Sequence, residues 1–268
     1  MVQNYFDLKD SNGKSTIKLT STNDKMKWVQ HGNSMRDFVN EVWLHSWADD
    51  RLMMPVVSAF KAESSDKAGT FKLIDLTDHS KPIEITRKAT TEEDTKNKNE
   101  VWLLQSLNYK SNSGVYNTDI GNRRYSSFDV DKAETKIEEI KPKPIFKGDF
   151  NALNIKTHND LIHSISDNVH KNYAKARASN LSRLSKFGAN TKRILVVDYG
   201  KIGIGDVVAV TVPIHNSSDP NDMQSGTYIV TEIRQTIETQ ETVKVYRKEL
   251  TLKRDANLAK ENKKILEG

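Results

Sequence analysis

The chain of 268 residues contains no cysteine. Disulfides, thiolate catalysis and cysteine-bound zinc are therefore excluded, and the composition fits a protein assembled in a reducing compartment. No stretch approaches the roughly 20 apolar residues that a membrane span requires, so we expect no membrane partner. The N-terminal sequence MVQNYFDLKD lacks both a basic region and an apolar core, and thus does not resemble a secretory signal peptide.

Apolar residues are also scarce. The hydrophobic fraction is 36% and the charged fraction is 29%, which favours modest modules joined by polar segments. The 41 basic and 36 acidic residues give a net charge of +5 and are largely interspersed. A nucleic-acid-binding protein usually concentrates its basic residues on one face, so the charge by itself does not indicate that function.

Signatures of chemistry are missing as well. The chain has no GxSxG, P-loop or paired-carboxylate signature, and His158, His163 and His170 lie five and seven residues apart, which is not a metal-ligand spacing. Gly203-Ile204-Gly205 could be half of a dinucleotide fingerprint, but a strand follows it instead of a helix, so we interpret both glycines as turn residues with positive φ. The sequence nominates no catalytic, cofactor-binding or metal-binding residue, and we expect a protein that is not an enzyme.

Four short runs rich in Val, Ile, Thr and Tyr dominate the C-terminal part of the chain. Clusters of Gly, Asn, Asp, Ser and Pro separate them, which is typical of antiparallel strands joined by turns. A polar loop over 216–226 lies between the second and third, and a five-residue link makes the last two a hairpin. Such a meander predicts a small barrel or curled sheet, with strands at Ile194–Tyr199, Val207–Val212, Tyr228–Ile237 and Val243–Leu252.

The clearest helix begins after Ser34, which can cap it, and we expect it to end near Trp47. Its apolar residues recur at helical spacing, so Trp43 and Trp47 are interpreted as core residues rather than as a stacking platform for bases or sugars. His45 has no partner at metal-ligand spacing and is interpreted as structural.

Several strands are expected after this helix, and together with it they predict an α+β module over 26–110. The charged run 87–100 is interpreted as a solvated loop. The strand at 52–60 is assigned to an edge because of Pro55. The predicted strands are Leu52–Phe60, Gly69–Leu76, a short edge at Ile83–Ile85, and Val101–Tyr109.

The remaining segments are more polar. Residues 1–25 are expected to form an N-terminal arm and 255–268 a polar tail. Residues 111–165 are expected to be an extended connection whose strands pair across modules or with another chain, since so long a structureless loop is unusual in a compact domain. Within it, 130–140 is interpreted as a short strand or a helical turn.

A second helix is predicted from Ser166 or Asp167 to Phe187, and with the strands that follow it forms a domain over 166–254. The stretch 169–187 is the most basic helix in the chain. A solvated face is the preferred interpretation, and a nucleic-acid-binding module is the alternative. Its basic residues are Lys171, Lys175, Arg177, Arg183 and Lys186. The fold class expected overall is α+β and mostly β, with a helix-plus-strands N-terminal module and an antiparallel, barrel-like C-terminal domain.

The order of these parts resembles a known family. The helix MRDFVNEVWLHS is followed by GTFKLIDL, by SNSGVYN, and then by VDYGKIGIGDVVAV, SGTYIVTEIRQTI and KELTLKR. This pattern resembles the central baseplate hub protein of contractile-tailed bacteriophages and of related contractile injection systems. The resemblance covers most of residues 26–253 and includes no catalytic motif.

The resemblance implies a structural virion protein without cofactor, which joins the tail tube to the central spike. It implies a homotrimer in which two barrel-like domains per chain form a pseudo-six-fold ring, in contact with the tail tube protein, the spike protein and other baseplate proteins. DNA would be a passing, non-specific cargo, and assembly would take place in the host cytoplasm. The residues before Met26 are too few for the family's first barrel, so we expect either a shortened chain or a separate polypeptide that supplies it.

Two other functions remain open at this point. One is the nucleic-acid-binding module on 169–187, which a steep fall of DNA affinity with salt would support. The other is a hydrolase acting on cell-wall sugar, for which the sequence nominates no acidic residue.

The strand expected at 228–237 leads to a first prediction. We expect Tyr228→Asp or Ile229→Asp to unfold the C-terminal domain, because each would bury an unpaired charge. Thermal melting followed by circular dichroism measures this. Two variants with the melting temperature of the wild type would show that the strand assignment is wrong.

Overall fold

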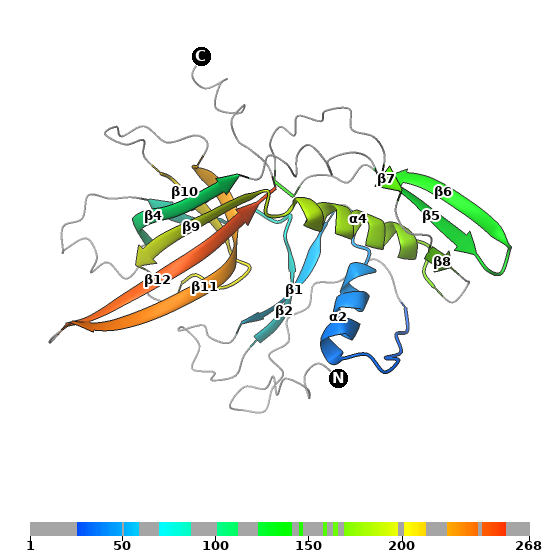
Figure 1. Ribbon diagram of the computed structural model, residues 1–268, viewed down its shortest axis with the longest axis horizontal. Helices are drawn as coiled ribbons and strands as arrows, with labels where there is room; N and C mark the ends of the chain where they lie inside the picture. The colour runs from blue at the N-terminus through cyan, green and yellow to red at the C-terminus, as the bar shows by residue number, and fades with distance from the viewer. Residues whose placement is uncertain are drawn as a thin grey trace, which may run out of the picture.

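A closed barrel of six strands forms the largest sheet of the structure (Figure 1). The computed structural model describes residues 26–49, 51–58, 70–86, 101–111, 123–140, 145–146, 158–159, 163–165, 169–197, 201–212, 224–240 and 243–255. The expected N-terminal arm, the charged loop 87–100 and the tail after 255 lie outside these residues. Around the barrel run the strands β10, β11, β12, β9, β4 and β3 in that order. Their bounds are β3 Ile83–Thr86, β4 Val101–Ser111, β9 Asn190–Val197, β10 Val207–Val210, β11 Gly226–Gln240 and β12 Val243–Arg254.

The four predicted C-terminal strands are all present as β9 to β12, with ends shifted by up to four residues. Their order differs from a four-stranded meander, because β9 pairs with β12 and not with β10. The segment Ile83–Ile85 was expected at an edge, and this prediction is wrong. β3 lies between β10 and β4 and pairs with both in parallel, which closes the barrel and covers two edges that would otherwise be open. The barrel thus combines strands from two predicted units. β3 and β4 come from the module predicted over 26–110, and β9 to β12 come from the domain predicted over 166–254.

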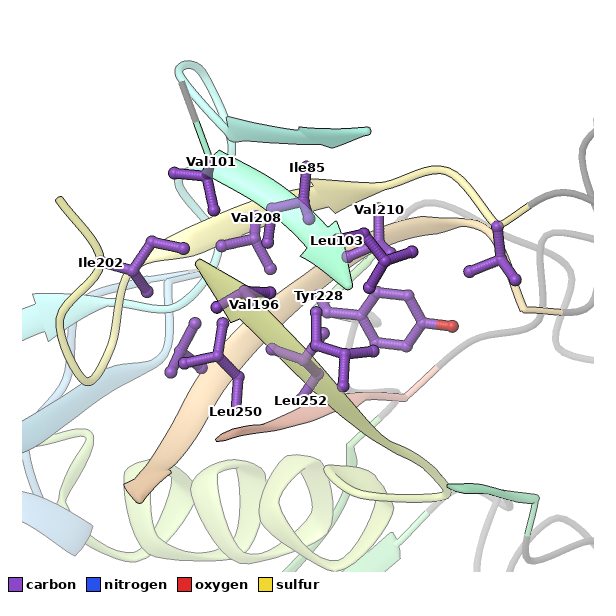
Figure 2. Packing of buried hydrophobic residues seen from close by; sticks show 13 residues of the cluster. Ile85, Val101, Leu103, Val196, Ile202, Val208, Val210, Tyr228, Leu250 and Leu252 are labelled. Atoms are coloured by element: carbon purple, nitrogen blue, oxygen red, sulfur yellow. The ribbon is translucent and has the colours of Figure 1, made fainter. Parts of the chain in front are cut away.

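The barrel is filled by the side chains of alternate residues, as the two-residue period of a strand requires. On β9 the buried and partly buried positions alternate along the whole strand. The inward side chains converge on Tyr228, which is 0% exposed, as Figure 2 shows. The cluster consists of Ile85, Val101, Leu103, Ile194, Val196, Ile202, Val208, Val210, Val212, Tyr228, Val230, Leu250 and Leu252.

A two-stranded antiparallel sheet of β1 (Met53–Ser58) and β2 (Thr70–Asp75) packs on the outside of the barrel. β2 is the only strand beside β1 in the described chain, so Pro55 has the edge position expected for it. A second apolar cluster joins this sheet to the barrel, and it includes the two-residue strap Ile145–Phe146. The backbone amides of that strap both donate to the buried Asp255 carboxylate, at 2.6 and 3.1 Å. The buried members of this second apolar cluster are Leu52, Leu76, Ile145, Phe146 and Ile229.

Helix α2 (Met35–Leu44) is capped as predicted. The Asp37 amide donates to Ser34 Oγ at 3.2 Å, and Ser34 Oγ donates to an Asp37 carboxylate oxygen at 2.6 Å. The helix ends at Leu44 rather than near Trp47, because the chain tightens into a turn in which Ser46 N donates to Trp43 O. Trp43 and Trp47 are only partly buried, so they lie at the margin of the core, where Trp43 Nε1 donates to Met53 O.

Helix α4 (Tyr173–Lys186) begins later than predicted. His170 sets the start, because its carbonyl accepts from Tyr173 N at 2.9 Å and its ring Nδ1 accepts from Asn172 N at 3.2 Å. These bonds hold a turn immediately before the helix. At the other end, Gly188 has a φ of +111° and terminates the helix as predicted.

A third sheet lies in the segment 111–165, which was expected to be an extended connection whose strands pair across modules or with another chain; its described strands pair with one another instead. β5 (Arg123–Asp129) pairs with β6 (Glu134–Ile140) as an antiparallel hairpin, and with the short strands β7 (His158–Asn159) and β8 (His163–Ile165) in parallel. Of the two interpretations left open for 130–140, the strand is confirmed. β6 is mostly exposed and lacks an apolar alternation, which explains why the sequence did not decide between strand and turn. The sheet packs on α4, and the described residues are mostly β with α+β character.

The turn before β10 is where the barrel meets the β1–β2 sheet. Gly205 has a φ of +86°, as predicted, whereas Gly203 does not have a positive φ. The Gly205 amide donates to Val230 O at 2.8 Å, and Asp206 accepts from Gly203 N at 2.7 Å. A Cβ at Gly205 would lie 2.5 Å from Ile74 Cδ1. The backbone at this position therefore requires glycine, and a Cβ there would also displace the end of the Ile74 side chain on β2.

We expect Gly205→Ala to lower the free energy of unfolding by roughly 2–4 kcal/mol, from the left-handed backbone and the contact with Ile74. Gly32→Ala is the matched control, because its φ is +66° but nothing lies within 4 Å of the added carbon. It should cost about 1 kcal/mol. Urea denaturation measures both, and equal losses would show that the approach of Ile74 is unimportant.

Candidate functional site

The basic residues predicted on α4 do not form one solvated face. Lys171 is exposed, Lys175 lies over the Trp47 ring at 5.0 Å, and Arg183 is only 3% exposed. Arg177 is partly buried, and the side chain of Lys186 lies outside the described residues. The helix is central to the fold, between α2 and the β5–β6 sheet (Figure 1). The surface on which the nucleic-acid interpretation depends is therefore largely used for packing within the chain.

His45 joins the two helices. Its ring is 1% exposed and stacks on Tyr173, with centroids 3.8 Å apart and planes 12° from parallel. Its Nδ1 lies 3.1 Å from Tyr173 O, and His170 Nε2 lies 3.1 Å from His45 O. Asn180 donates to the two carbonyls on either side of His45, those of Leu44 and Ser46, at 3.0 and 3.1 Å. The arrangement fixes α2 against α4 and engages His45 in packing.

A metal centre has no support in the described part of the chain, where no three His, Asp or Glu residues gather closely enough to hold an ion. The side chains of His158 and His163 lie outside the described residues, so the spacing argument against a histidine site stays a prediction from the sequence. No helix among the described residues has the length and apolar character to cross a membrane.

Buried cations occupy the two ends of the barrel. Lys192, Lys248 and Arg254 are 0%, 2% and 1% exposed. Lys248 Nζ donates to Ile202 O at 2.7 Å at one end. At the other end Lys192 Nζ donates to the carbonyl and side-chain oxygens of Gln224, both at 3.1 Å. Arg254 donates to Ser225 O at 3.0 Å, and its guanidinium lies 4.5 Å from the centre of the Tyr228 ring.

These cations were not found from the sequence, although a signal existed. Lys192 shares the inward parity of Ile194 and Val196, and Lys248 and Arg254 share that of the leucines on β12. Burial and, to a smaller extent, the nearby charge of Arg254 together lower the pKa of Lys192 to about 8. Each cation binds backbone or amide oxygens, so the barrel is a closed scaffold whose ends are held by polar contacts.

The outer face of the barrel carries an open depression of about 480 Å³. It lies beside the β-bulge between Val230 and Glu232, where β11 shifts register against β12. Arg193 forms an ion pair with Glu249, and Thr251 Oγ1 donates to Glu232 Oε2 at 3.2 Å. The lining consists of Arg193, Glu232, Ile233, Arg234, Glu249 and Thr251. The lining thus carries two cations and two carboxylates, of which Arg193 and Glu249 pair with each other.

No protein-family model matches the chain, and no curated protein matches its sequence. Among solved structures, the tail protein from Neisseria meningitidis MC58 matches with a TM-score of 0.48 and 12% sequence identity. The match covers 90% of this chain and 62% of that one, so this chain spans less than two thirds of the length of that tail protein. A likeness at this level concerns the outline of the backbone and assigns no function.

The buried Lys192 leads to a prediction about pH. Its pKa is about 8 in the folded chain and 10.5 in the unfolded chain, so the unfolded chain binds more protons between these values. The free energy of unfolding should therefore rise between pH 8 and 10, by roughly 2 kcal/mol relative to Lys192→Met. Denaturant titrations of the wild type and of Lys192→Met test this. Tyrosines also ionise in this pH range, but they are present in both proteins, so their effect cancels in the difference. Parallel pH profiles would contradict the assignment.

Proposed function

We propose that this chain is a structural subunit of a contractile phage tail or of a related injection machine. In its broader form the proposal makes the chain a structural tail protein. In its narrower form the chain is the baseplate hub subunit that joins the tail tube to the central spike. The resemblance of residues 26–253 to the hub family is the starting point, and it includes both the helix α2 and the barrel strands.

One observation carries the proposal. The sequence segments that resemble the C-terminal barrel of hub proteins are those that form a barrel here. Gly205-Asp206 opens β10, the segment 225–237 lies in β11, and the segment 248–254 lies in β12. Tyr228, which begins the return strand in that comparison, lies at the centre of the barrel (Figure 2). The segments that resemble the hub family in sequence therefore form the barrel strands that the resemblance led us to expect.

The described polar side chains support a role in assembly rather than catalysis. The buried cations hold the barrel ends, His45 joins two helices, and Asp255 anchors the strap at 145–146. Each has a structural task in the fold. We propose accordingly that the chain has neither enzymatic activity nor a resident cofactor.

The proposal defines the partners and the location. The chain would form a homotrimer, contact the tail tube protein, the spike protein and other baseplate proteins, and reside in the virion tail after assembly in the host cytoplasm. DNA would pass through the assembly without sequence-specific contact.

Light scattering of the purified chain, alone and mixed with the tail tube and spike proteins encoded beside it, tests this function. We expect a defined complex with those neighbours. A chain that ignores both neighbours would contradict the proposal. If it also bound DNA with an affinity that falls steeply with salt, the nucleic-acid-binding alternative would replace it.

A further inference from the structure

The strands β11 and β12 continue well beyond the barrel. They pair with each other from Ile229↔Lys253 to Gln240↔Val243. β10 covers β11 only over 226–229, and β9 covers β12 only over 248–254. The free edge of β11 therefore begins at 231 and that of β12 lies over 243–247. Beyond the end of β9, residues 236–240 and 243–247 continue as a two-stranded ribbon, which runs to the tip at the lower left of Figure 1. We call the segments 231–240 and 243–247, which carry these free edges, the ribbon.

Both long edges of the ribbon are open in the described part of the chain, where no third strand pairs with either of them. An open edge presents unpaired backbone amides and carbonyls and is a template for another strand. Ile237 lies in the middle of the β11 edge and is 69% exposed, more than any other large apolar residue described. A two-stranded ribbon is marginally stable in water by itself. The ribbon thus has the features of an element that is completed by another strand.

The two edges carry opposite charge. The β11 segment 231–240, TEIRQTIETQ, contains two glutamates and one arginine. The β12 segment 243–247, VKVYR, contains one lysine and one arginine and no acidic residue. Pairing of two β12 edges would place cations against cations, whereas a β11 edge placed beside a β12 edge brings unlike charges together. The partner that fits best is therefore the ribbon of a second copy of this chain.

We infer that the ribbon is the self-association element of this protein, in which the β11 edge of one copy pairs with the β12 edge of the next. Such a contact joins two different surfaces, so repeated copies close into a ring when the rotation between them permits. Alternate β11 and β12 strands would continue the antiparallel order of the ribbon and would cover Ile237. The number of copies, three, rests on the proposed function, whereas the choice of edges stands on the ribbon itself.

Light scattering of Ile237→Lys against the wild type tests the inference, since an edge lysine blocks strand addition. We expect the wild type at three times the 30.5 kDa of one chain, and the variant at the mass of one chain with an unchanged melting temperature. The matched control is Ile137→Lys on β6, because Ile137 is 59% exposed on another sheet. It should retain the mass of the wild type.

Reversing the charges on the two edges tests whether these edges pair with each other, independently of any general effect of an added lysine. Lys244→Glu combined with Arg247→Glu should reduce the mass towards one chain, and adding Glu232→Lys and Glu238→Lys to that protein should restore it. A monomeric wild type, a dimer, an Ile237→Lys protein that stays assembled, or an equal loss in the Ile137→Lys control would overturn the inference. A different result would contradict the proposed function: a correctly assembled ring that binds neither the tail tube protein nor the spike protein.

Discussion

The structure depends on closure of the barrel by β3. These four residues pair in parallel with β10 on one side and with β4 on the other, and no other described strand connects those two. Without β3 the sheet would have two open edges and the apolar row behind it would face water. Ile85 is 0% exposed and contributes directly to the barrel core. The β1–β2 sheet then packs on the outside of the closed barrel, where Met54 and Ile74 meet Ile229 and Val207.

Closure also explains the buried cations. A six-stranded barrel is narrow, so its middle is filled by apolar side chains and its ends are left for groups that can reach polar atoms. Lysine and arginine suit these ends, because their long stems pack on the core while their heads reach backbone oxygens. Lys192 and Lys248 use opposite ends in this way. Their burial costs stability, which is the origin of the lowered pKa of Lys192.

The surfaces outside the barrel are better suited than its interior to a role in assembly. The barrel interior is occupied by its own side chains, whereas the outer face carries the charged depression and the ribbon carries two open edges. A scaffold that positions such surfaces fits a subunit of a larger particle. Glu232, Ile233 and Arg234 belong to both the depression and the ribbon, whereas Ile237 belongs to the ribbon and does not line the depression.

The sequence by itself determined the local elements whose signals are strong over short distances. Strands β9 to β12, the cap of α2 at Ser34, the end of α4 at Gly188 and the need for glycine at 205 were all predictable, because periodicity, capping and backbone conformation depend on neighbouring residues. It also predicted the mostly-β class. It did not decide between a strand and a helical turn at β6, whose exposed and polar residues lack an apolar alternation.

Only the tertiary structure decided which segments meet. The parallel pairing of β3 with β10 joins segments more than 100 residues apart, and short apolar runs carry no record of their partner. The same is true of the polar contacts. Whether Lys192 or Arg183 faces water or the interior, and whether His45 meets Tyr173, depends on packing between distant elements. The ribbon likewise became visible only when the lengths of four paired strands could be compared.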